Sequence, residues 1–278
     1  MCDGGQFDGS FRHRLATELN AATAARAAAL PFTPTLATVL VGDDPGSTKY
    51  VQIKQRRCVQ YGLGSRHVHL PADTSTAELV AVLIELGVDP AVHGILLQHP
   101  LPPQIDERAA FDAIPLRKDV DGTSSAAFAA AALGQAGHRS RTPAGIVRLL
   151  DHYRVELAGE DVVIVGRSGI LGKPLAAMLT ARDATVTVCH SRTRDLAAHT
   201  SRAEILVAAA GRPGLITAAM VRSGAVVVDA GFTPGDVSEE AAEVARAASP
   251  VPGGVGPMTI AMLLAQTVDA AQAVVGTR

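Results

Sequence analysis

Lys54 and Tyr50 stand at a spacing that could support chemistry on a bound ring. In a helix, residues four apart lie on one face, one turn from each other. An aromatic ring beside an amine could form a platform for a flat ligand, with a proton-transfer group at its edge. Lys49, Arg56 and Arg57 are close by in the sequence, so a solvated cationic helix face is the competing interpretation.

Two further segments end in polar side chains. Gln98 and His99 follow the apolar run GILL, at the end of an expected strand, where open α/β sheets bind ligands. Gln98 could equally satisfy loop backbone, and a lone histidine such as His99 is more often structural. In KDVDG, Asp119 and Asp121 are two residues apart, so in an extended chain one carboxylate could face a cleft and the other solvent. No His or Cys accompanies them, so we expect no metal site.

The segment VVIVGRSGILGKP, residues 162–174, joins an apolar run to three glycines at steps of three, Gly166, Gly169 and Gly172. This order predicts a buried strand, a tight turn and the start of a helix. Such a turn gathers backbone N–H groups and the positive end of a helix, which suits a diphosphate. Its spacing is one residue longer than the usual dinucleotide fingerprint, and a turn of this kind need not bind a ligand.

The next expected strand ends in His190, Ser191, Arg192 and Thr193. An NAD enzyme needs a carboxylate near this position for the ribose 2′-hydroxyl. Here a hydroxyl and a guanidinium stand instead, with Arg167 of the glycine turn as a second cation, and such groups bind a 2′-phosphate. We therefore predict NADP as the cofactor in preference to NAD. Solvated arginines at a strand end are the alternative.

Near the C-terminus, the segment SPVPGGVGPMT (249–259) contains three prolines and three glycines. It is too rigid and too poor in side chains for a flexible linker. Such a segment could bring backbone close to a ligand, or could simply shape a turn.

Length and composition limit the class of protein. The 278 residues suffice for about two domains, and 47% hydrophobic with 19% charged residues is typical of a globular chain. A net charge of -2, 3% aromatics and no Trp argue against a nucleic-acid partner. No apolar run reaches the roughly 18 residues of a membrane span, and no signal segment begins the chain. With three widely separated cysteines, we expect reduced thiols and a cytoplasmic location.

Apolar runs and turn residues predict strands that alternate with helices in both halves of the chain. Ser47 is expected to cap a helix, Ser75 and Glu78 to form a capping box, and Thr142 with Pro143 to start another helix. An Ala/Gly run at 124–137 could be a helix, although we expect it to include the connection between domains. Strands are expected at 36–41, 66–70, 94–98, 162–165, 184–189, 204–209 and 225–229, and helices at 11–29, 47–61, 175–182, 238–248 and 260–275.

Eight motifs follow one another from Tyr50 to Thr259: YVxxK, GILLQHPLP, KDVDG, TPxGI, VGRSxxxGKP, CHSRT, DxG and PVPGGVGPMT. Their order resembles the bifunctional methylenetetrahydrofolate dehydrogenase/methenyltetrahydrofolate cyclohydrolase (FolD-type) family over nearly the whole chain. The resemblance implies NADP-dependent oxidation of 5,10-methylenetetrahydrofolate, followed by hydrolysis of the 5,10-methenyl product to 10-formyltetrahydrofolate, in one-carbon metabolism and purine biosynthesis.

The same resemblance implies an α/β fold of two α/β domains with an interdomain cleft. Residues 1–139, completed by a C-terminal helix at 258–278, would form the N-terminal catalytic (folate) domain. Residues 140–257 would form a Rossmann-type, doubly wound NADP-binding domain. The expected partners are a reduced folate as small-molecule substrate and a second copy of the chain in a homodimer; no nucleic acid and no membrane is expected.

Roles for single residues also follow from the resemblance. The catalytic positions would be Lys54, Gln98 and Asp121, with Tyr50 stacking on the folate and Asp121 holding the pterin. Substrate-binding positions would further include Pro252, Gly253 and Gly254. Cofactor-binding positions would be Gly166, Arg167, Ser168, Gly172, Ser191, Arg192 and Phe232.

Several positions differ from the family's pattern. Thr123 stands where a bulky apolar residue is usual, Arg141 where Cys is common, and Phe232-Thr233 where Ile-Asn is usual; the segment 233–249 is also shorter. A monofunctional dehydrogenase and a non-catalytic NADP- or folate-binding regulator are therefore the alternatives. A shikimate-dehydrogenase-like enzyme would share the two-domain plan, but it does not suit PVPGGVGPMT or the glutamine before HPLP.

Overall fold

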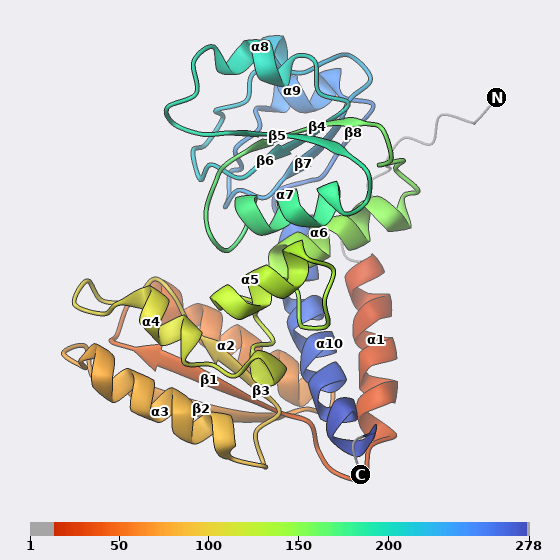
Figure 1. Cartoon of the computed structure of the whole chain (residues 1–278). Coiled ribbons are helices and arrows are strands. Elements are labelled where there is room, and N and C mark those ends of the chain that lie inside the picture. Colours follow the sequence, from red (N-terminus) through yellow and green to blue (C-terminus); the bar gives the residue numbers. More distant parts are fainter. Residues whose placement is uncertain (1–13, 277–278) are drawn as a thin grey trace. The chain divides into compact units, whose positions relative to one another are not determined.

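The structure is a computed structural model that describes residues 14–276, and these fall into two compact units (Figure 1). The N-terminal unit comprises residues 18–141 and 260–276, and the central unit comprises residues 14–17 and 142–259. Each unit is described by itself. Of the helix expected at 11–29, residues 11–13 lie outside the described part of the chain, and the rest forms α1 (Arg14–Ala28).

The N-terminal unit is built on a parallel sheet of three strands in the order β2-β1-β3. The strands are β1 (Thr35–Val41), β2 (Gly64–Leu70) and β3 (Gly94–Leu97), each within two residues of its predicted start. The helices in chain order are α2 (Pro45–Gln60), α3 (Thr76–Val88), α4 (Glu107–Asp112) and α5 (Ser125–Ala132). The last helix, α10 (Val255–Gly276), belongs to this unit from residue 260 onward.

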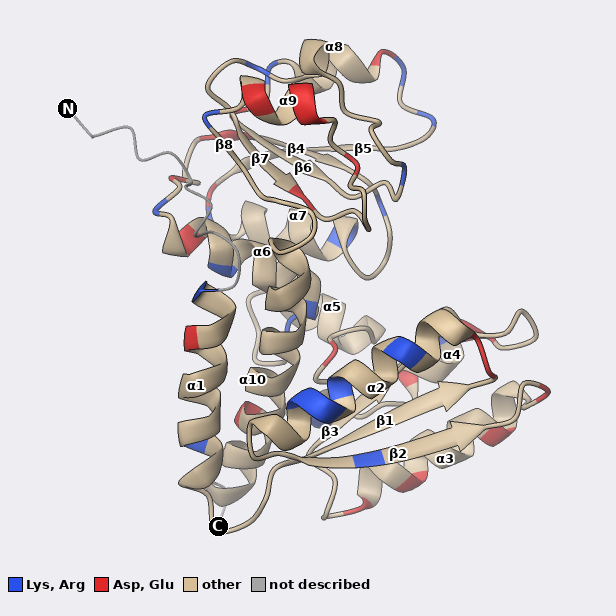
Figure 2. Ribbon diagram, turned by 180° about the vertical axis from the view of Figure 1, so that it is seen from behind, with Lys and Arg blue, Asp and Glu red and all other residues tan. Residues whose placement is uncertain are grey.

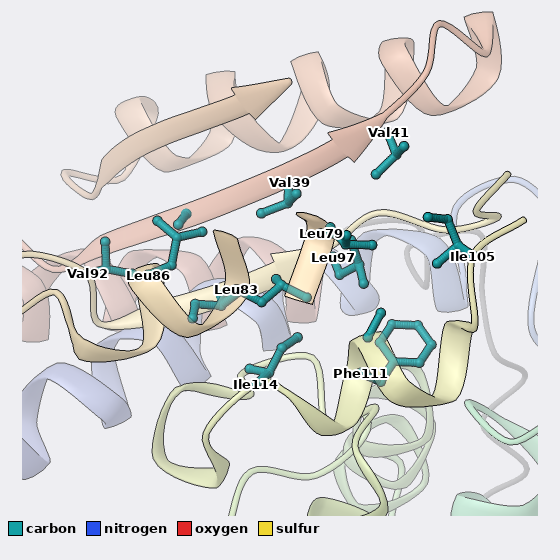
Figure 3. Packing of buried hydrophobic residues seen from close by; sticks show 13 residues of the cluster. Val39, Val41, Leu79, Leu83, Leu86, Val92, Leu97, Ile105, Phe111 and Ile114 are labelled. Atoms are coloured by element: carbon teal, nitrogen blue, oxygen red, sulfur yellow. The ribbon is translucent and has the colours of Figure 1, made fainter. Parts of the chain in front are cut away.

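Both faces of this sheet are covered, because alternate residues of β1 and β3 enter different clusters. One cluster joins the sheet to α3 and α4, and Figure 3 shows it with Val39, Val41, Leu79, Leu83, Leu97 and Phe111 among its members. The other joins it to α1, α2 and α10, and includes Ala27, Leu36, Cys58, Leu96, Leu263 and Val268. Burial on both faces explains why these strands are almost continuously apolar in sequence.

Two helix starts show how local sequence determines the elements. The capping box is confirmed, since Ser75 N donates to Glu78 Oε2 at 2.8 Å and Glu78 N donates to Ser75 Oγ at 3.3 Å. The prediction that Ser47 caps α2 is wrong. Asp44 is the N-cap and accepts from Ser47 N at 2.7 Å, and Pro45 begins the helix. A carboxylate directly before a proline at the first helical position provides the stronger start.

The central unit contains a parallel sheet of five strands in the order β5-β4-β6-β7-β8. The strands are β4 (Asp161–Val165), β5 (Thr185–Cys189), β6 (Ile205–Ala208), β7 (Val226–Asp229) and β8 (Ala247–Ala248). Its helices are α6 (Arg141–His152), α7 (Gly172–Thr180), α8 (Leu196–Thr200) and α9 (Glu239–Val244). The chain runs from β4 to one side for β5 and to the other side for β6, which is the doubly wound plan that the sequence predicts.

Two predicted features of the loops are wrong. The Ala/Gly run does not connect the units but forms α5 inside the N-terminal unit, where Ser124 Oγ accepts from Ala127 N at 3.1 Å. Thr142 is not an N-cap, because α6 begins one residue earlier, at Arg141. The Thr142 hydroxyl instead lies 3.2 Å from the hydroxyl of Thr259.

The last helix, α10, is longer than predicted, and it is also long and apolar enough to match a membrane span. It begins at Val255 rather than at 260, so half of the Pro/Gly-rich segment is helical. By length and composition α10 could cross a membrane, contrary to the expectation that no run is long enough. However, 56% of its most apolar window is buried, and Leu263, Leu264 and Val268 belong to the core of the N-terminal unit. Burial of that kind is typical of a core helix.

Candidate active site

Lys54 is a buried residue on α2, although the helix is otherwise cationic on its surface. The buried positions of α2 are Ser47, Val51, Lys54 and Cys58, a helical stripe that faces the sheet. The Lys54 side chain is accordingly only 4% exposed. The solvated-face interpretation is therefore wrong for Lys54. It holds for Lys49, Arg56 and Arg57, which are exposed on the helix whose basic residues are blue in Figure 2.

Gln98 fixes the amine of Lys54 at the end of β3. Lys54 Nζ donates to Gln98 Oε1 at 2.6 Å, and Gln98 Nε2 donates to the carbonyl oxygen of His99 at 2.6 Å. The backbone N–H of Gln98 donates to Val39 O at 2.8 Å, which ties the residue to β1. The structural interpretation of Gln98 is thus confirmed, since one end of its amide satisfies the loop backbone, and the other end orients the lysine.

The surroundings of Lys54 favour its uncharged form. Burial lowers the pKa of Lys54 to about 7; the positive charge of Arg141 acts in the same direction, and the negative charge of Asp121 opposes both. An amine with such a pKa is a free base in a large fraction of molecules at neutral pH, as a general base must be.

Asp121 is the second buried group of the site, and it is paired with Arg141. Arg141 Nε lies 2.9 Å from Asp121 Oδ1, with side chains that are 12% and 4% exposed. The backbone N–H of Arg141 also donates to Asp121 O at 3.3 Å. Asp121 Oδ2 and Arg141 Nη1 are buried without a hydrogen-bond partner among residues 14–276. The pair therefore presents one free acceptor and one free donor.

Asp119 differs from the expectation that one carboxylate of KDVDG faces solvent. Asp119 is fully buried, and it accepts from Thr123 N at 3.2 Å and from Ser124 N at 2.8 Å. Burial raises the pKa of Asp119, and these hydrogen bonds act against the rise. The residue shapes the loop before α5, and Thr123 takes part in that loop through its backbone and hydroxyl.

Gln266 on α10 is a residue that the sequence analysis missed. Its Nε2 donates to Val120 O at 2.8 Å and to Arg139 O at 3.0 Å, and its Oε1 accepts from Arg139 N at 2.9 Å. It therefore joins the turn that contains Asp121 to the segment that ends at Arg141. A lone amide within the apolar stretch IAMLLAQTV was the available indication.

Gly122 allows these two segments to come close, because its φ is +63° and a Cβ there would overlap the backbone of Arg139 and Ser140. Gly134 is a matched control, with a φ of +67° and no atom within 4 Å of a Cβ. Both alanine substitutions incur the left-handed backbone penalty of about 1 kcal/mol. We expect Gly122→Ala to lower the free energy of unfolding by about 1 kcal/mol more than Gly134→Ala in urea titrations. Equal losses would contradict the close approach.

In the central unit, the glycine turn after β4 is closed by its own backbone. Gly166 has a φ of +143°, and a Cβ there would overlap Ala209 O; a Cβ on Gly172 would overlap Gly166 O. Ser168 Oγ accepts from Leu171 N at 3.1 Å at the start of α7. The two outer glycines are therefore required by the turn itself. The first N–H groups of α7 are engaged within the turn, because Gly172 N lies 3.5 Å from Ser168 Oγ and Lys173 N donates to Ser168 O at 3.1 Å.

The loop after β5 lies at the same edge of the sheet, because β4 and β5 are parallel neighbours. His190 N donates to Thr193 Oγ1 at 2.8 Å, and Arg192 N donates to His190 Nδ1 at 3.1 Å. Ser191, Arg192 and Arg167 of the glycine turn are exposed. The next acidic residue along the chain, Asp195, is the N-cap of α8, where it accepts from Ala198 N.

Two buried aspartates, which the sequence analysis did not predict, shape the loops near Phe232. Asp236 accepts from the N–H groups of residues 210, 211 and 212, and Asp229 accepts from Gly231 N at 2.8 Å and Val237 N at 2.9 Å. Burial raises the pKa of Asp229. Phe232 itself is 73% exposed. Asp236 directly follows the turn residues Pro234 and Gly235, in the short sequence GDV at residues 235–237.

The structure brings Lys54, Gln98 and Asp121 together in the N-terminal unit, with Tyr50 half-exposed one turn before Lys54 on α2. The predicted substrate-binding segment 252–254 belongs to the central unit. There Gly253 has a φ of +115°, and a Cβ on Gly254 would lie 2.8 Å from Pro250 O. Pro252 is exposed, and both glycines are buried against their own segment.

Two family models together match most of the chain. The model of the tetrahydrofolate dehydrogenase/cyclohydrolase catalytic domain matches residues 3–121, and the model of the NAD(P)-binding domain of the same family matches residues 140–275. The bifunctional protein FolD 1 of Salinispora arenicola is 60% identical over 243 residues, which cover 86% of this chain and 87% of that protein.

Solved structures give the same result. The bifunctional FolD from Campylobacter jejuni has a TM-score of 0.92 and 39% identity, with 94% of this chain and 96% of that chain covered. FolD of Trypanosoma brucei, solved with NADP cofactor and inhibitor, has a TM-score of 0.88 and 33% identity over 94% and 96% of the two chains. The chain belongs to the tetrahydrofolate dehydrogenase/cyclohydrolase family, with the catalytic and NAD(P)-binding domains of a bifunctional FolD-type enzyme.

Proposed function

We propose that the chain oxidises 5,10-methylenetetrahydrofolate with NADP and then hydrolyses the 5,10-methenyl product to 10-formyltetrahydrofolate, with Lys54 as the general base of the second step. The observation that supports this most directly is the buried Lys54 amine, held 2.6 Å from Gln98 Oε1 in the same site as the Asp121 carboxylate.

The oxidation requires alignment rather than a base. Loss of hydride from the methylene carbon leaves a cation delocalised over two nitrogens, and no proton has to leave. NADP, when bound, accepts that hydride. The contribution of the chain is to hold the folate in place. Tyr50, 46% exposed on α2, would stack on the folate, and Asp121 would accept from the pterin N–H and amino groups through its free Oδ2.

The hydrolysis does require a base. Water attacks the methenyl carbon and must lose a proton as the new C–O bond forms. The Lys54 amine takes that proton and can return it to N5 as the C–N5 bond breaks. The hydroxyl of the adduct gives up its own proton as the C=O bond forms, so the formyl group stays on N10 and one proton is released overall. Lys54 can do this only when uncharged, and its lowered pKa meets that condition. Gln98 orients the amine without adding a charge.

The residues of the central unit fit an NADP molecule. The turn from Gly166 to Gly172, including Ser168, would hold the diphosphate at the N-terminus of α7. Arg167, Ser191 and Arg192 would bind the 2′-phosphate. The cap role of Asp195 supports NADP over NAD, since that carboxylate already has a partner. Phe232 would lie beside the nicotinamide, and Pro252, Gly253 and Gly254 would bind the substrate through their backbone.

An absorbance assay with purified protein tests this function. With 5,10-methylenetetrahydrofolate and NADP, the methenyl species should appear and then decay, and kcat/KM should be at least about tenfold higher with NADP than with NAD, as expected for a charged 2′-phosphate contact. Equal efficiency with both cofactors would remove the NADP assignment. A methenyl species that persists would identify a monofunctional dehydrogenase, and tight binding without turnover would identify a regulator.

We also propose that the enzyme works as a homodimer in the cytoplasm and supplies formyl groups for purine biosynthesis. Membership of the family supports this proposal. Sedimentation of the purified chain at micromolar concentration tests the dimer.

A further inference from the structure

Arg141 is a charged side chain of the buried site for which the two reactions above require no role. It holds Asp121 twice, through Nε to Oδ1 at 2.9 Å and through its backbone N–H to Asp121 O at 3.3 Å. The pair is nearly closed to solvent, with side chains 12% and 4% exposed. As a purely structural element it would be poor, since Asp121 Oδ2 and Arg141 Nη1 are buried without hydrogen-bond partners among the described residues, and such atoms destabilise a fold.

The Asp121 carboxylate, which would bind the pterin, also favours the charged form of Lys54, the proposed general base. Asp121 is close enough to Lys54 for its negative charge to favour the ammonium form, and an ammonium cannot accept a proton. Arg141 is paired with that same carboxylate, and a guanidinium group carries a permanent positive charge in proteins. A fixed positive charge at this position offsets the charge of Asp121 without taking Asp121 away from the substrate.

We propose, on the basis of the proposed function, that Arg141 is a positioning residue for the hydrolysis step: it fixes the Asp121 carboxylate for the pterin and keeps the Lys54 amine available as a free base.

The other groups near Lys54 do not replace Arg141. His99 follows β3 and interacts with Lys54, but burial lowers the pKa of His99, which disfavours a positive charge on the ring. The negative charge of Glu107, on α4, acts to raise the pKa of His99. Gln98 carries no charge. Arg141 and Asp121 are therefore the charges that act on the amine at neutral pH, and their effects on the pKa of Lys54 have opposite signs.

Direct titration of Lys54 tests the proposal without reference to turnover. The chain has four lysines, so ¹³C-labelled lysine gives few NMR signals, and Lys54→Met assigns the one of interest. In Arg141→Met, the midpoint of the Lys54 signal should rise by about one pH unit or more. In Arg141→Lys, which keeps the charge, it should stay within about half a unit. Arg139→Met is the matched control, because Arg139 lies two residues earlier and its guanidinium donates to Gln135 O. A midpoint that does not move in Arg141→Met overturns the proposal.

Kinetics provide the second measurement. In Arg141→Met, kcat for methenyl hydrolysis at pH 7 should fall by at least about fivefold and recover near pH 9, after subtraction of the uncatalysed rate, while hydride transfer keeps its pH profile. If Arg141→Met does not fold, the double variant that carries both Arg141→Met and Asp121→Asn is titrated in its place. Its Lys54 midpoint should exceed that of Asp121→Asn alone by about one unit, and equal midpoints overturn the proposal. A protein without any turnover removes the proposed function, whereas an unmoved Lys54 midpoint in a protein that hydrolyses the methenyl substrate overturns this inference alone.

Discussion

Lys54→Met is expected to slow the hydrolysis of 5,10-methenyltetrahydrofolate by about 10²- to 10⁴-fold, the range that a general base contributes. The attacking water must lose a proton, and the buried amine 2.6 Å from Gln98 Oε1 is positioned to take it. Oxidation of the methylene substrate should change by less than about tenfold, because that step releases a hydride and no proton. The affinities for folate and for NADP should persist, since Asp121 and the glycine turn are unchanged.

Lys54→Met and the wild type should be compared in two separate assays, one for NADPH formation and one for decay of the methenyl absorbance. Lys49→Met is the matched control, because Lys49 is on the same helix but exposed, and both activities should be those of the wild type. Full hydrolysis in Lys54→Met would remove lysine from the mechanism. Loss of both activities together would instead indicate that Lys54 holds the substrate.

Much of the fold could be predicted from the sequence because the decisive patterns are local. The box of Ser75 and Glu78 is such a pattern, and so is the apolar run before Gly166. The errors occur where a neighbouring residue competes. Asp44 displaced Ser47 as the cap of α2, and α10 begins within a segment whose glycines suggested a turn. The short helices α4 and α8 and the two-residue strand β8 are too short for a periodic signal. The strands β3, β6 and β7 are equally short but are marked by continuous apolar runs.

The site was predictable as a set of residues but not as an arrangement. Spacing alone could not separate Lys54 from the exposed cations of α2; its place on the buried stripe with Val51 and Cys58 does so. Nor could sequence show that Gln266 holds two distant segments together, since residues 120, 139 and 266 meet only in the folded chain. The pairing of Arg141 with Asp121 is of the same kind. It depends on a close approach that Gly122 permits.

The buried amine should also make stability depend on pH in a way that Lys54→Met abolishes. In the unfolded chain the pKa of Lys54 returns to 10.5, whereas in the folded protein it is about 7. Between these values the unfolded state binds one more proton than the folded state. The contribution of Lys54 to the free energy of unfolding therefore rises with pH, by up to about 1.4 kcal/mol per pH unit. Below pH 7 both states are protonated, and the folded protein has to bury a charge.

Methionine fills a similar volume and does not titrate. At pH 6, Lys54→Met should therefore have a higher free energy of unfolding than the wild type, and this difference should shrink by about 3 kcal/mol by pH 9. Urea titrations of both proteins at several pH values measure the difference, followed by circular dichroism because the chain has no Trp. Groups shared by the two proteins cancel in the subtraction, and Lys49→Met should show a constant difference from the wild type. A constant difference for Lys54→Met would mean that the folded protein keeps this lysine charged, and a charged lysine cannot take a proton from the attacking water.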